Sequence, residues 1–284
     1  MSTTSTRPTG ATGALEASDP LATIAEQHTG PRTPPAPIPL SRVVRVELRK
    51  MFDTRSGFWL MTGIAILALA ATAAVIAFAP DADLTYESFA TAIGVPMAVI
   101  LPVVAILAVT SEWSQRTGLT TFTLVPARGR VLAVKAGLAV LIGVVSMFLA
   151  AAIGAVGNIV GSNIAGVDTV WNIAASNLAT IVLANVLGLL VGFMLGTLLR
   201  SSAAAIVGYF VYSFVLPSAT SALAAAQDWY RDLGPWIDFN YAMAPLFDGV
   251  PTGEQWAQLA TSGTIWLLVP LAVGLRLILR AEVK

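Results

Sequence analysis

The chain of 284 residues contains no cysteine and a single histidine, His28, which lies in a polar stretch near the N-terminus. The lack of cysteine excludes disulfide bonds, a thiolate metal site and a cysteine nucleophile. One isolated histidine argues against a zinc site or a histidine-based catalytic triad. The sequence also has neither a GxxxxGK[ST] phosphate loop nor a GxGxxG turn between a strand and a helix. We therefore expect no cofactor on this chain and no enzymatic activity of its own.

Charged residues are scarce as well. They make up 11% of the chain, against about 25% in an average globular domain, while hydrophobic residues make up 56%. A helix needs roughly 20 apolar residues to cross a bilayer, and the segments that satisfy this requirement run approximately over 57–79, 88–110, 132–157, 173–199, 202–223 and 258–279. No charged residue falls in the middle of these segments. The sequence therefore predicts an all-α, polytopic membrane protein with six transmembrane helices.

The basic residues predict how these spans are oriented. If the spans alternate in direction, one side of the membrane collects Arg42, Arg45, Arg49, Lys50, Arg55, Arg116, Arg128, Arg130, Lys135, Arg200, Arg276, Arg280 and Lys284. The other side has only Arg231. Because cytoplasmic loops carry the excess of lysine and arginine, we expect both termini in the cytoplasm. A chain rich in Ala, Val, Gly and Arg but poor in Lys points to a GC-rich bacterial genome. With the predicted spans, we expect the chain in the cell membrane of a bacterium.

The N-terminal part has a different composition from the rest. Residues 1–37 are rich in Thr, Ala, Gly and Pro, and they lack the basic and apolar regions of a signal peptide. We expect a disordered cytoplasmic tail there. Residues 38–284 then form the six-span transmembrane domain.

A basic amphipathic helix is predicted just before the first span. Its apolar residues Leu40, Val44, Leu48, Met51 and Phe52 share one face of a helical wheel. The charged residues of this segment include Arg42, Arg45, Glu47, Arg49 and Lys50. Such a helix is expected to lie in the inner membrane interface, with its cations near anionic headgroups. A role limited to anchoring the topology is an equally good interpretation.

Small and polar residues mark the fourth span. Gly188, Gly192 and Gly196 recur every four residues, which predicts close approach of another helix from this chain or from a second subunit. Asn177 and Asn185 are the most polar residues expected deep in a span. Such residues more often hydrogen-bond between helices than line a substrate pathway, and both readings remain open.

The longest segment on the predicted outer side, residues 224–257, mixes acidic residues with seven aromatic ones. We call it the outer segment. Rings with polar groups favour the membrane–water interface, so we expect short interfacial or re-entrant helices here. An aromatic belt is the simpler interpretation, and a gate for substrate is the alternative.

The stretch "TSEWSQRTGLTTFTLVPARGR", residues 110–130, interrupts the apolar sequence on the cytoplasmic side. We call it the cytoplasmic loop. It is either a plain connection between two spans or a surface that receives a partner. Its candidate contact residues are Glu112, Trp113, Arg116, Thr117, Gly118, Pro126, Arg128 and Arg130.

Three features resemble the membrane subunits of ABC transporters, in particular the type-2 exporter permeases. One is "VELRKMFDTRSGFW" before the first span, which is similar to a Glu-x-x-Lys stretch common there in this family. Another is "SEWSQRTGLTTFTLVPARGRVLAVK", whose polar residues resemble those of the family's first cytoplasmic loop. The third is the six-span plan with a long aromatic segment before the last span. Together they cover about residues 38–284.

The resemblance implies a permease subunit of an ATP-driven exporter that forms the transmembrane pathway. It implies a second permease subunit, identical or related, and a separate cytoplasmic ATPase subunit that holds ATP and Mg²⁺. The cytoplasmic loop would hold a coupling helix that docks on this ATPase. No nucleic acid is implied, and lipid is the remaining partner. The alternative is a membrane scaffold or sensor that binds an ATPase without transporting a substrate.

Overall fold

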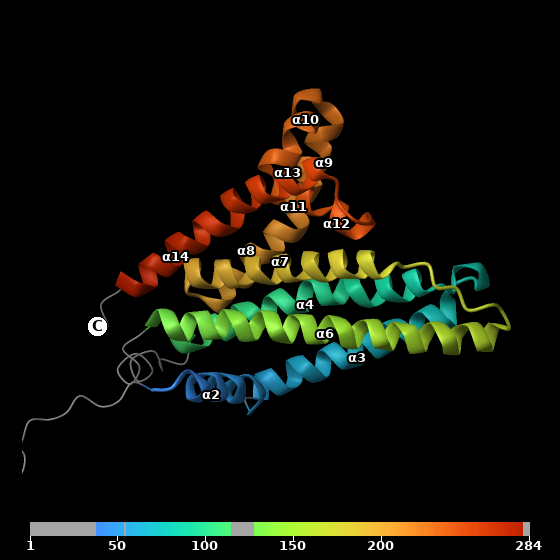
Figure 1. The fold of residues 1–284 in the computed structure, drawn as a ribbon, viewed down its shortest axis with the longest axis horizontal. Helices are drawn as coiled ribbons and strands as arrows, with labels where there is room; N and C mark the ends of the chain where they lie inside the picture. Colours follow the sequence, from blue (N-terminus) through green and yellow to red (C-terminus); the bar gives the residue numbers. More distant parts are fainter. Residues whose placement is uncertain (1–37, 54, 115–127, 281–284) are drawn as a thin grey trace, which may run out of the picture. The chain divides into compact units, whose positions relative to one another are not determined.

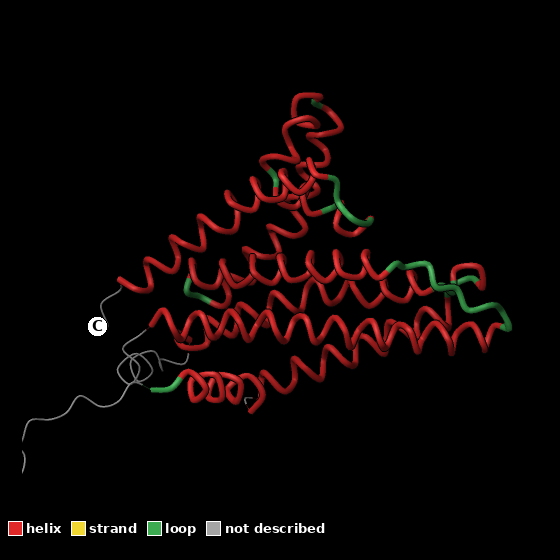
Figure 2. The backbone as a smooth tube through the Cα atoms, in the orientation of Figure 1, coloured by secondary structure: helices red, strands yellow, loops and turns green. Residues whose placement is uncertain are grey.

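The computed structural model describes residues 38–53, 55–114 and 128–280 of the chain. Contacts divide the chain into residues 1–38 and 39–284, and the second unit carries the described helices. The predicted tail, residues 1–37, lies outside the described residues. Within them the protein is all-helical, as predicted, and no β-strand is formed (Figure 2). A single bridge, Thr85 to Val170, is the extent of β pairing in this part of the chain.

The first half of the second unit consists of long helices. They are α2 (Leu40–Asp53), α3 (Arg55–Phe78), α4 (Tyr86–Ser114), α6 (Arg128–Ala165) and α7 (Ala175–Leu199), with the short 3₁₀ turn η1 (Asp81–Asp83) before α4. Figure 1 shows α3, α4, α6 and α7 running alongside one another in alternating directions. Consecutive long helices therefore form antiparallel hairpins, as short connections require.

The second half is built from shorter pieces. It comprises α8 (Ser202–Phe210), η2 (Val211–Val215), α9 (Leu216–Ala226), α10 (Asp228–Ile237), α11 (Phe239–Met243), α12 (Pro245–Asp248), α13 (Gly253–Gly263), η3 (Thr264–Leu268) and α14 (Val269–Arg280). The π-helical turns η2 and η3 join their flanking helices into two continuous but irregular rods. The short helices α10, α11 and α12 confirm that the outer segment folds as short helices.

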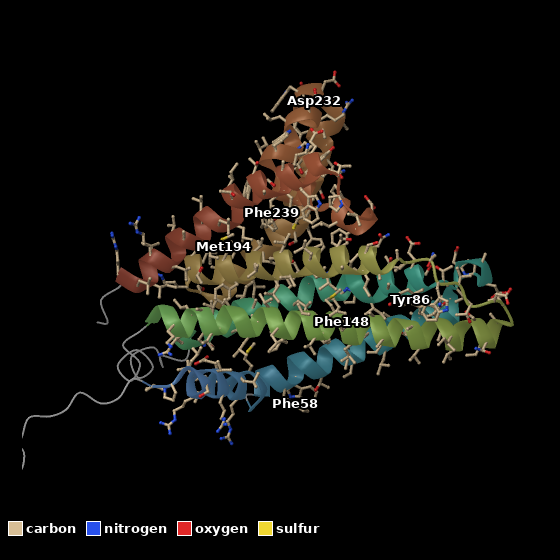
Figure 3. The ribbon with its side chains drawn as sticks, in the orientation of Figure 1. Phe58, Tyr86, Phe148, Met194, Asp232 and Phe239 are labelled. Atoms are coloured by element: carbon tan, nitrogen blue, oxygen red, sulfur yellow. The ribbon has the colours of Figure 1, made fainter. Side chains whose placement is uncertain are left out.

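Five helices in the described part of the chain are long and apolar enough to cross a membrane. They span Tyr86–Ser111, Gly129–Ala165, Ala175–Leu199, Ser202–Ala226 and Gly253–Arg280. In α3 the apolar stretch Thr62–Phe78 is shorter than the 18 residues required of these five helices. These helices indicate a membrane protein. Large apolar side chains such as Phe58 and Phe148 (Figure 3) are each 58% exposed, which suits a lipid environment far better than water.

Two apolar clusters hold the helices together. One joins α3, α4, α6, α7 and α14 through buried residues that include Ile93, Met97, Leu101, Leu189 and Phe193. The other joins α4, α7, α8, α11, α12, α13 and η3, with Phe239 and Leu246 almost completely buried. Helices α4 and α7 contribute to both clusters, so this pair is the central element of the fold.

The connection between α7 and α8 shows how the sequence ends one helix and begins the next. Arg200 has φ 52°, and among the described residues it alone is a non-glycine residue with positive φ. Its N–H closes the last turn of α7 on the Gly196 carbonyl. Ser201 then caps α8 by accepting a hydrogen bond from the Ala204 N–H at 3.4 Å. The two residues between the predicted spans 173–199 and 202–223 thus form a tight hairpin.

Candidate functional site

A buried ion pair lies where α2, α4 and α6 meet. The Lys135 ammonium donates a hydrogen bond to Glu47 Oε2 at 2.6 Å, and the two side chains are 4% and 5% exposed. Glu47 lies on α2, ahead of the first span, whereas Lys135 lies on the second turn of α6. This contact fixes the amphipathic helix to the helix that follows the cytoplasmic loop.

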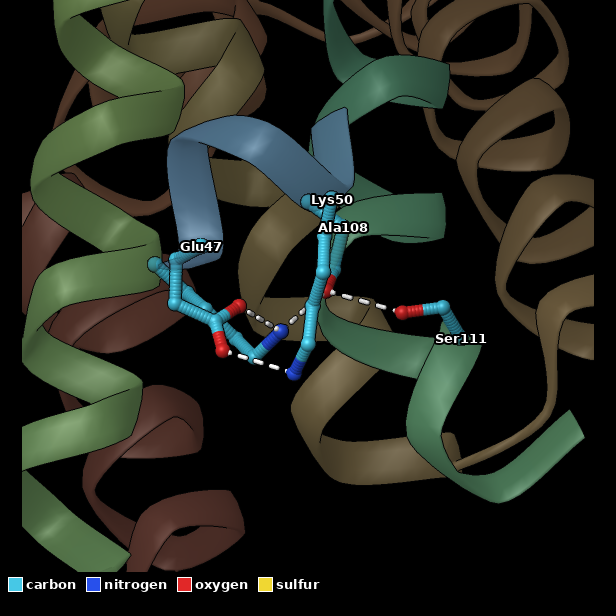
Figure 4. Close-up of polar contacts among 5 residues, drawn as sticks. Glu47, Lys50, Ala108 and Ser111 are labelled. Carbon is cyan, nitrogen blue, oxygen red and sulfur yellow. Dashed lines mark hydrogen bonds and ion pairs between the residues drawn. The ribbon is translucent and has the colours of Figure 1, made fainter. Parts of the chain in front are cut away.

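Neighbouring groups complete the site (Figure 4). Lys50 donates to Glu47 Oε1 at 2.8 Å from the solvent-facing side of α2. Lys135 also donates to the Ala108 carbonyl of α4 at 3.1 Å, and Ser111 donates to the same oxygen at 3.3 Å. The Lys135 ammonium therefore bridges α2 to the C-terminal part of α4. We call Glu47, Lys50, Ala108, Ser111 and Lys135 the junction cluster.

The electrostatics of the junction cluster favour a charged Glu47. Burial by itself raises the pKa of Glu47, but the charge and hydrogen bond of Lys135, followed by those of Lys50, outweigh it. The net result is a pKa below the ordinary value. Burying an ion pair costs desolvation free energy, so such pairs contribute more to a defined geometry than to stability. Here the geometry is the roll and position of α2 against α6.

The junction cluster lies at the base of the cytoplasmic loop. Helix α4 ends at Ser114 and α6 begins at Arg128, so Ala108 and Lys135 lie about two turns from the ends of the two helices that flank the loop. Of the predicted loop residues, Glu112, Trp113, Arg128 and Arg130 belong to these helices, and Arg130 is exposed. The remaining ones, Arg116, Thr117, Gly118 and Pro126, lie outside the described residues.

The structure shows which side of α2 packs on the protein. Leu40 and Leu48, on the apolar face of the wheel, are 47% and 37% exposed, and contact of this face with the membrane interface stays a prediction. The residues buried most deeply are Val43 and Glu47. This side carries Glu47 toward Lys135, and the ion pair holds the helix in that orientation. The predicted basic residues Arg42, Arg45 and Arg49 are exposed.

The predicted glycine stripe packs within this chain, against α4. A Cβ placed on Gly192 would lie 2.7 Å from the Pro102 carbonyl oxygen, and one on Gly196 would collide with Val109. A Cβ on Gly188 would have Tyr209 Oη at 3.8 Å as its nearest neighbour among the described atoms. Two of the three glycines are therefore needed for close approach of α4 and α7, and the third is not.

The two asparagines predicted for the pathway differ in depth. Asn177 lies in the first turn of α7, is only partly buried and accepts a hydrogen bond from Ser176 at 3.4 Å. It is therefore not deep in a span. Asn185 is 6% exposed and donates to the Ile181 carbonyl of its own helix at 2.9 Å. Its Oδ1 has no hydrogen-bond partner among the described residues.

Sequence reasoning missed the pairing of Glu47 with Lys135. Two signals were present: a carboxylate one helical turn after Val43, and a single lysine just inside the predicted span 132–157. One sequence does not show that these two residues meet. The described residues hold no group of three or more His, Cys, Asp or Glu side chains that could bind a metal. No protein-family model matches the chain, and no curated protein matches it significantly.

Proposed function

We propose that this chain is a six-span permease subunit of an ATP-driven exporter of the ABC type, with both termini in the cytoplasm of a bacterial cell. It would couple to a separate ATPase subunit through the cytoplasmic loop. The observation that carries the proposal is the junction cluster. It ties α2, α4 and α6 into one unit at the place where the loop leaves and re-enters the helices. A force applied to the loop would reach three helices together.

The need for a partner follows from the sequence. No nucleotide-binding motif is present, and no span carries an ionisable residue at its centre that could couple transport to protons or sodium. An active transporter of this composition would take its energy from another polypeptide. The basic residues of the loop, such as Arg116 and Arg128, are suited to pair with carboxylates on that partner.

The junction cluster has the properties of a transmission element. Lys135 of α6 contacts both α2 and α4. For α6 to shift relative to either helix, one of these charged hydrogen bonds would have to break. Breaking such a contact is costly because it leaves a buried charge without its partner. Movement of the loop would therefore pass to α2, α4 and α6 together and rearrange the spans between alternating access states.

Native purification tests this proposal. The chain is tagged at its C-terminus, solubilised gently, and the co-eluting proteins are identified by mass spectrometry. The proposal expects a protein with a phosphate-loop motif in stoichiometric amount, together with a second permease chain. Elution alone would contradict it. Co-elution of an ATPase whose rate of ATP hydrolysis is unchanged by every candidate substrate would favour the scaffold or sensor instead.

A further inference from the structure

Both helical rods that border the outer segment are interrupted in the same manner. The π-helical turn η2 is followed by Pro217 and the π-helical turn η3 by Pro270. In η2 the Leu216 N–H bonds to the Val211 carbonyl, five residues back, and not to the carbonyl of Tyr212. Pro217 has no N–H to offer. The Tyr212 carbonyl is thus left without a donor from its own helix, and π-helical turns of this kind are frequent at functional sites.

The joint between α10 and α11 bonds to both interrupted rods. Asn240 Nδ2 donates to the orphaned Tyr212 carbonyl of η2 at 3.0 Å. Trp266 of η3 donates from its indole Nε1 to the Ile237 carbonyl at 2.6 Å. The Tyr212 and Trp266 rings lie 6.4 Å apart, centroid to centroid. Each rod is therefore hydrogen-bonded to the joint between α10 and α11, and the ring contact joins the two rods directly.

Asp238 makes this joint rigid. Its carboxylate is buried, and Oδ1 accepts hydrogen bonds from the Asn240 and Tyr241 N–H groups at 2.9 and 3.3 Å. Its other oxygen accepts the Tyr230 hydroxyl at 3.2 Å. These contacts fix the backbone from which Asn240 reaches η2. The Asn240 amide is thereby held within reach of the Tyr212 carbonyl.

One face of α13 is covered by α10 and α11. A Cβ on Gly263 would lie 3.0 Å from the Phe239 ring of α11, so the two helices meet closely there. Ser262, next to Gly263, is completely buried, and its hydroxyl donates to the Gln258 carbonyl at 2.8 Å. Leu259, Ser262, Gly263 and Trp266 share this face by helical spacing. Exposure of Ser262 therefore reports whether α10 and α11 have lifted from α13.

We propose that α10 and α11 form a latch that holds the rods α8–η2–α9 and α13–η3–α14 together, and that the latch opens by breaking the Asn240–Tyr212 and Trp266–Ile237 hydrogen bonds. The π-helical turns and the prolines supply the hinges, because they already lack part of the regular hydrogen bonding. The latch goes beyond the proposed transport function. Its contacts lie within one chain, so it is tested without any ATPase.

The test uses the absence of cysteine from the chain. Ser262→Cys places one thiol under the latch, and Ser162→Cys provides the control. Ser162 is also fully buried and also donates to a carbonyl four residues back, at 2.7 Å, but it lies on α6. Each cysteine is combined with Asn240→Leu, which removes the amide at similar size, or with Trp266→Phe, which keeps a ring and removes the donor. Labelling by a membrane-impermeant maleimide is followed over time.

Loss of either hydrogen bond should speed labelling of the Ser262→Cys thiol by roughly three- to tenfold, in line with the net contribution of one bond. The rate at the Ser162→Cys thiol should not change. An unchanged rate at Ser262→Cys in both variants would overturn the proposal and leave the outer segment as a static aromatic belt. An equal rise at Ser162→Cys would also overturn it, because the variants would then loosen the whole protein.

Discussion

Glu47 and Lys135 are 88 residues apart in the chain, yet their charged groups approach to 2.6 Å in a site nearly closed to solvent. A carboxylate on an amphipathic helix would ordinarily face water or headgroups. Here it faces the protein, and the roll of α2 follows from that contact. The amphipathic helix is therefore part of the helical framework, held by a specific pair and not only by its apolar side chains.

Removal of one partner should be more harmful than removal of both. Lys135→Met leaves the Glu47 carboxylate buried with only Lys50 as a partner, so the free energy of unfolding should fall by about 3–5 kcal/mol. The double variant Glu47→Gln with Lys135→Met has no buried charge to solvate and should recover most of the loss. Equilibrium unfolding in mixed micelles measures both. Additive losses would show that the two side chains act independently.

Acid should weaken the attachment of α2. The folded pKa of Glu47 lies below its ordinary value of 4.5, since Lys135 and Lys50 together outweigh the effect of burial. The stability from this group is therefore fully present above about pH 4.5 and is lost as the pH falls through the lower, folded pKa. Thermal unfolding between pH 7 and 3 should show this decline in the native chain. Glu47→Gln should lack that component, and identical profiles would contradict the assignment.

Tyr209 and Tyr212 form a matched pair for a hydrogen-bond test. Pro102 of α4 cannot donate to the Ala98 carbonyl four residues back, and the Tyr209 hydroxyl donates to it instead at 2.8 Å. Tyr209→Phe leaves a partly buried carbonyl unpaired and should cost about 1–3 kcal/mol. The Tyr212 hydroxyl is buried with no partner among the described residues, so Tyr212→Phe should be neutral or stabilising. Equal losses in the two variants would refute this reading.

The glycine stripe of α7 should respond unevenly to added methyl groups. Gly192→Ala and Gly196→Ala each force α4 and α7 apart, because their Cβ atoms would meet Pro102 and Val109. Overpacking of this kind costs typically about 1–3 kcal/mol. Gly188→Ala, with its nearest described neighbour at 3.8 Å, should be tolerated and can serve as the control. Thermal stability in detergent ranks the three variants, and a uniform effect would mean that the close approach of α4 is not decisive.

The helical class and the helices themselves could be predicted because apolar length and turn chemistry are local properties. The hairpin at Arg200 is an example, since the predicted spans 173–199 and 202–223 leave only two residues between them. The ends of the spans differ more from the structure. The predicted span 132–157 belongs to a helix that continues to Ala165. Ser162 and Asn163 are accommodated in its last turns by hydrogen bonds to carbonyls of the same helix.

The features that define the candidate site could not be predicted from one sequence, because they depend on long-range pairing. Lys135 was visible as a charge near the end of a span, but its two acceptors come from α2 and α4. Similarly, a proline such as Pro217 removes a backbone donor wherever it stands in a helix. The sequence does not show that Asn240 donates to the carbonyl left unpaired there. The stripe of three glycines does not reveal that α4 contacts only two of them closely.

A cross-link from the cytoplasmic loop tests the central claim most directly. Gly118→Cys introduces the sole cysteine of the chain, and a thiol-to-amine cross-linker is applied to gently solubilised membranes. A second chain carrying Ser176→Cys, an exposed position in the first turn of α7, as its only thiol controls for non-specific capture. The account predicts a covalent product between residue 118 and a protein with a phosphate-loop motif, absent from the control. A loop that never cross-links to such a protein, although the thiol reacts fully with a small maleimide, would contradict the proposed coupling to an ATPase.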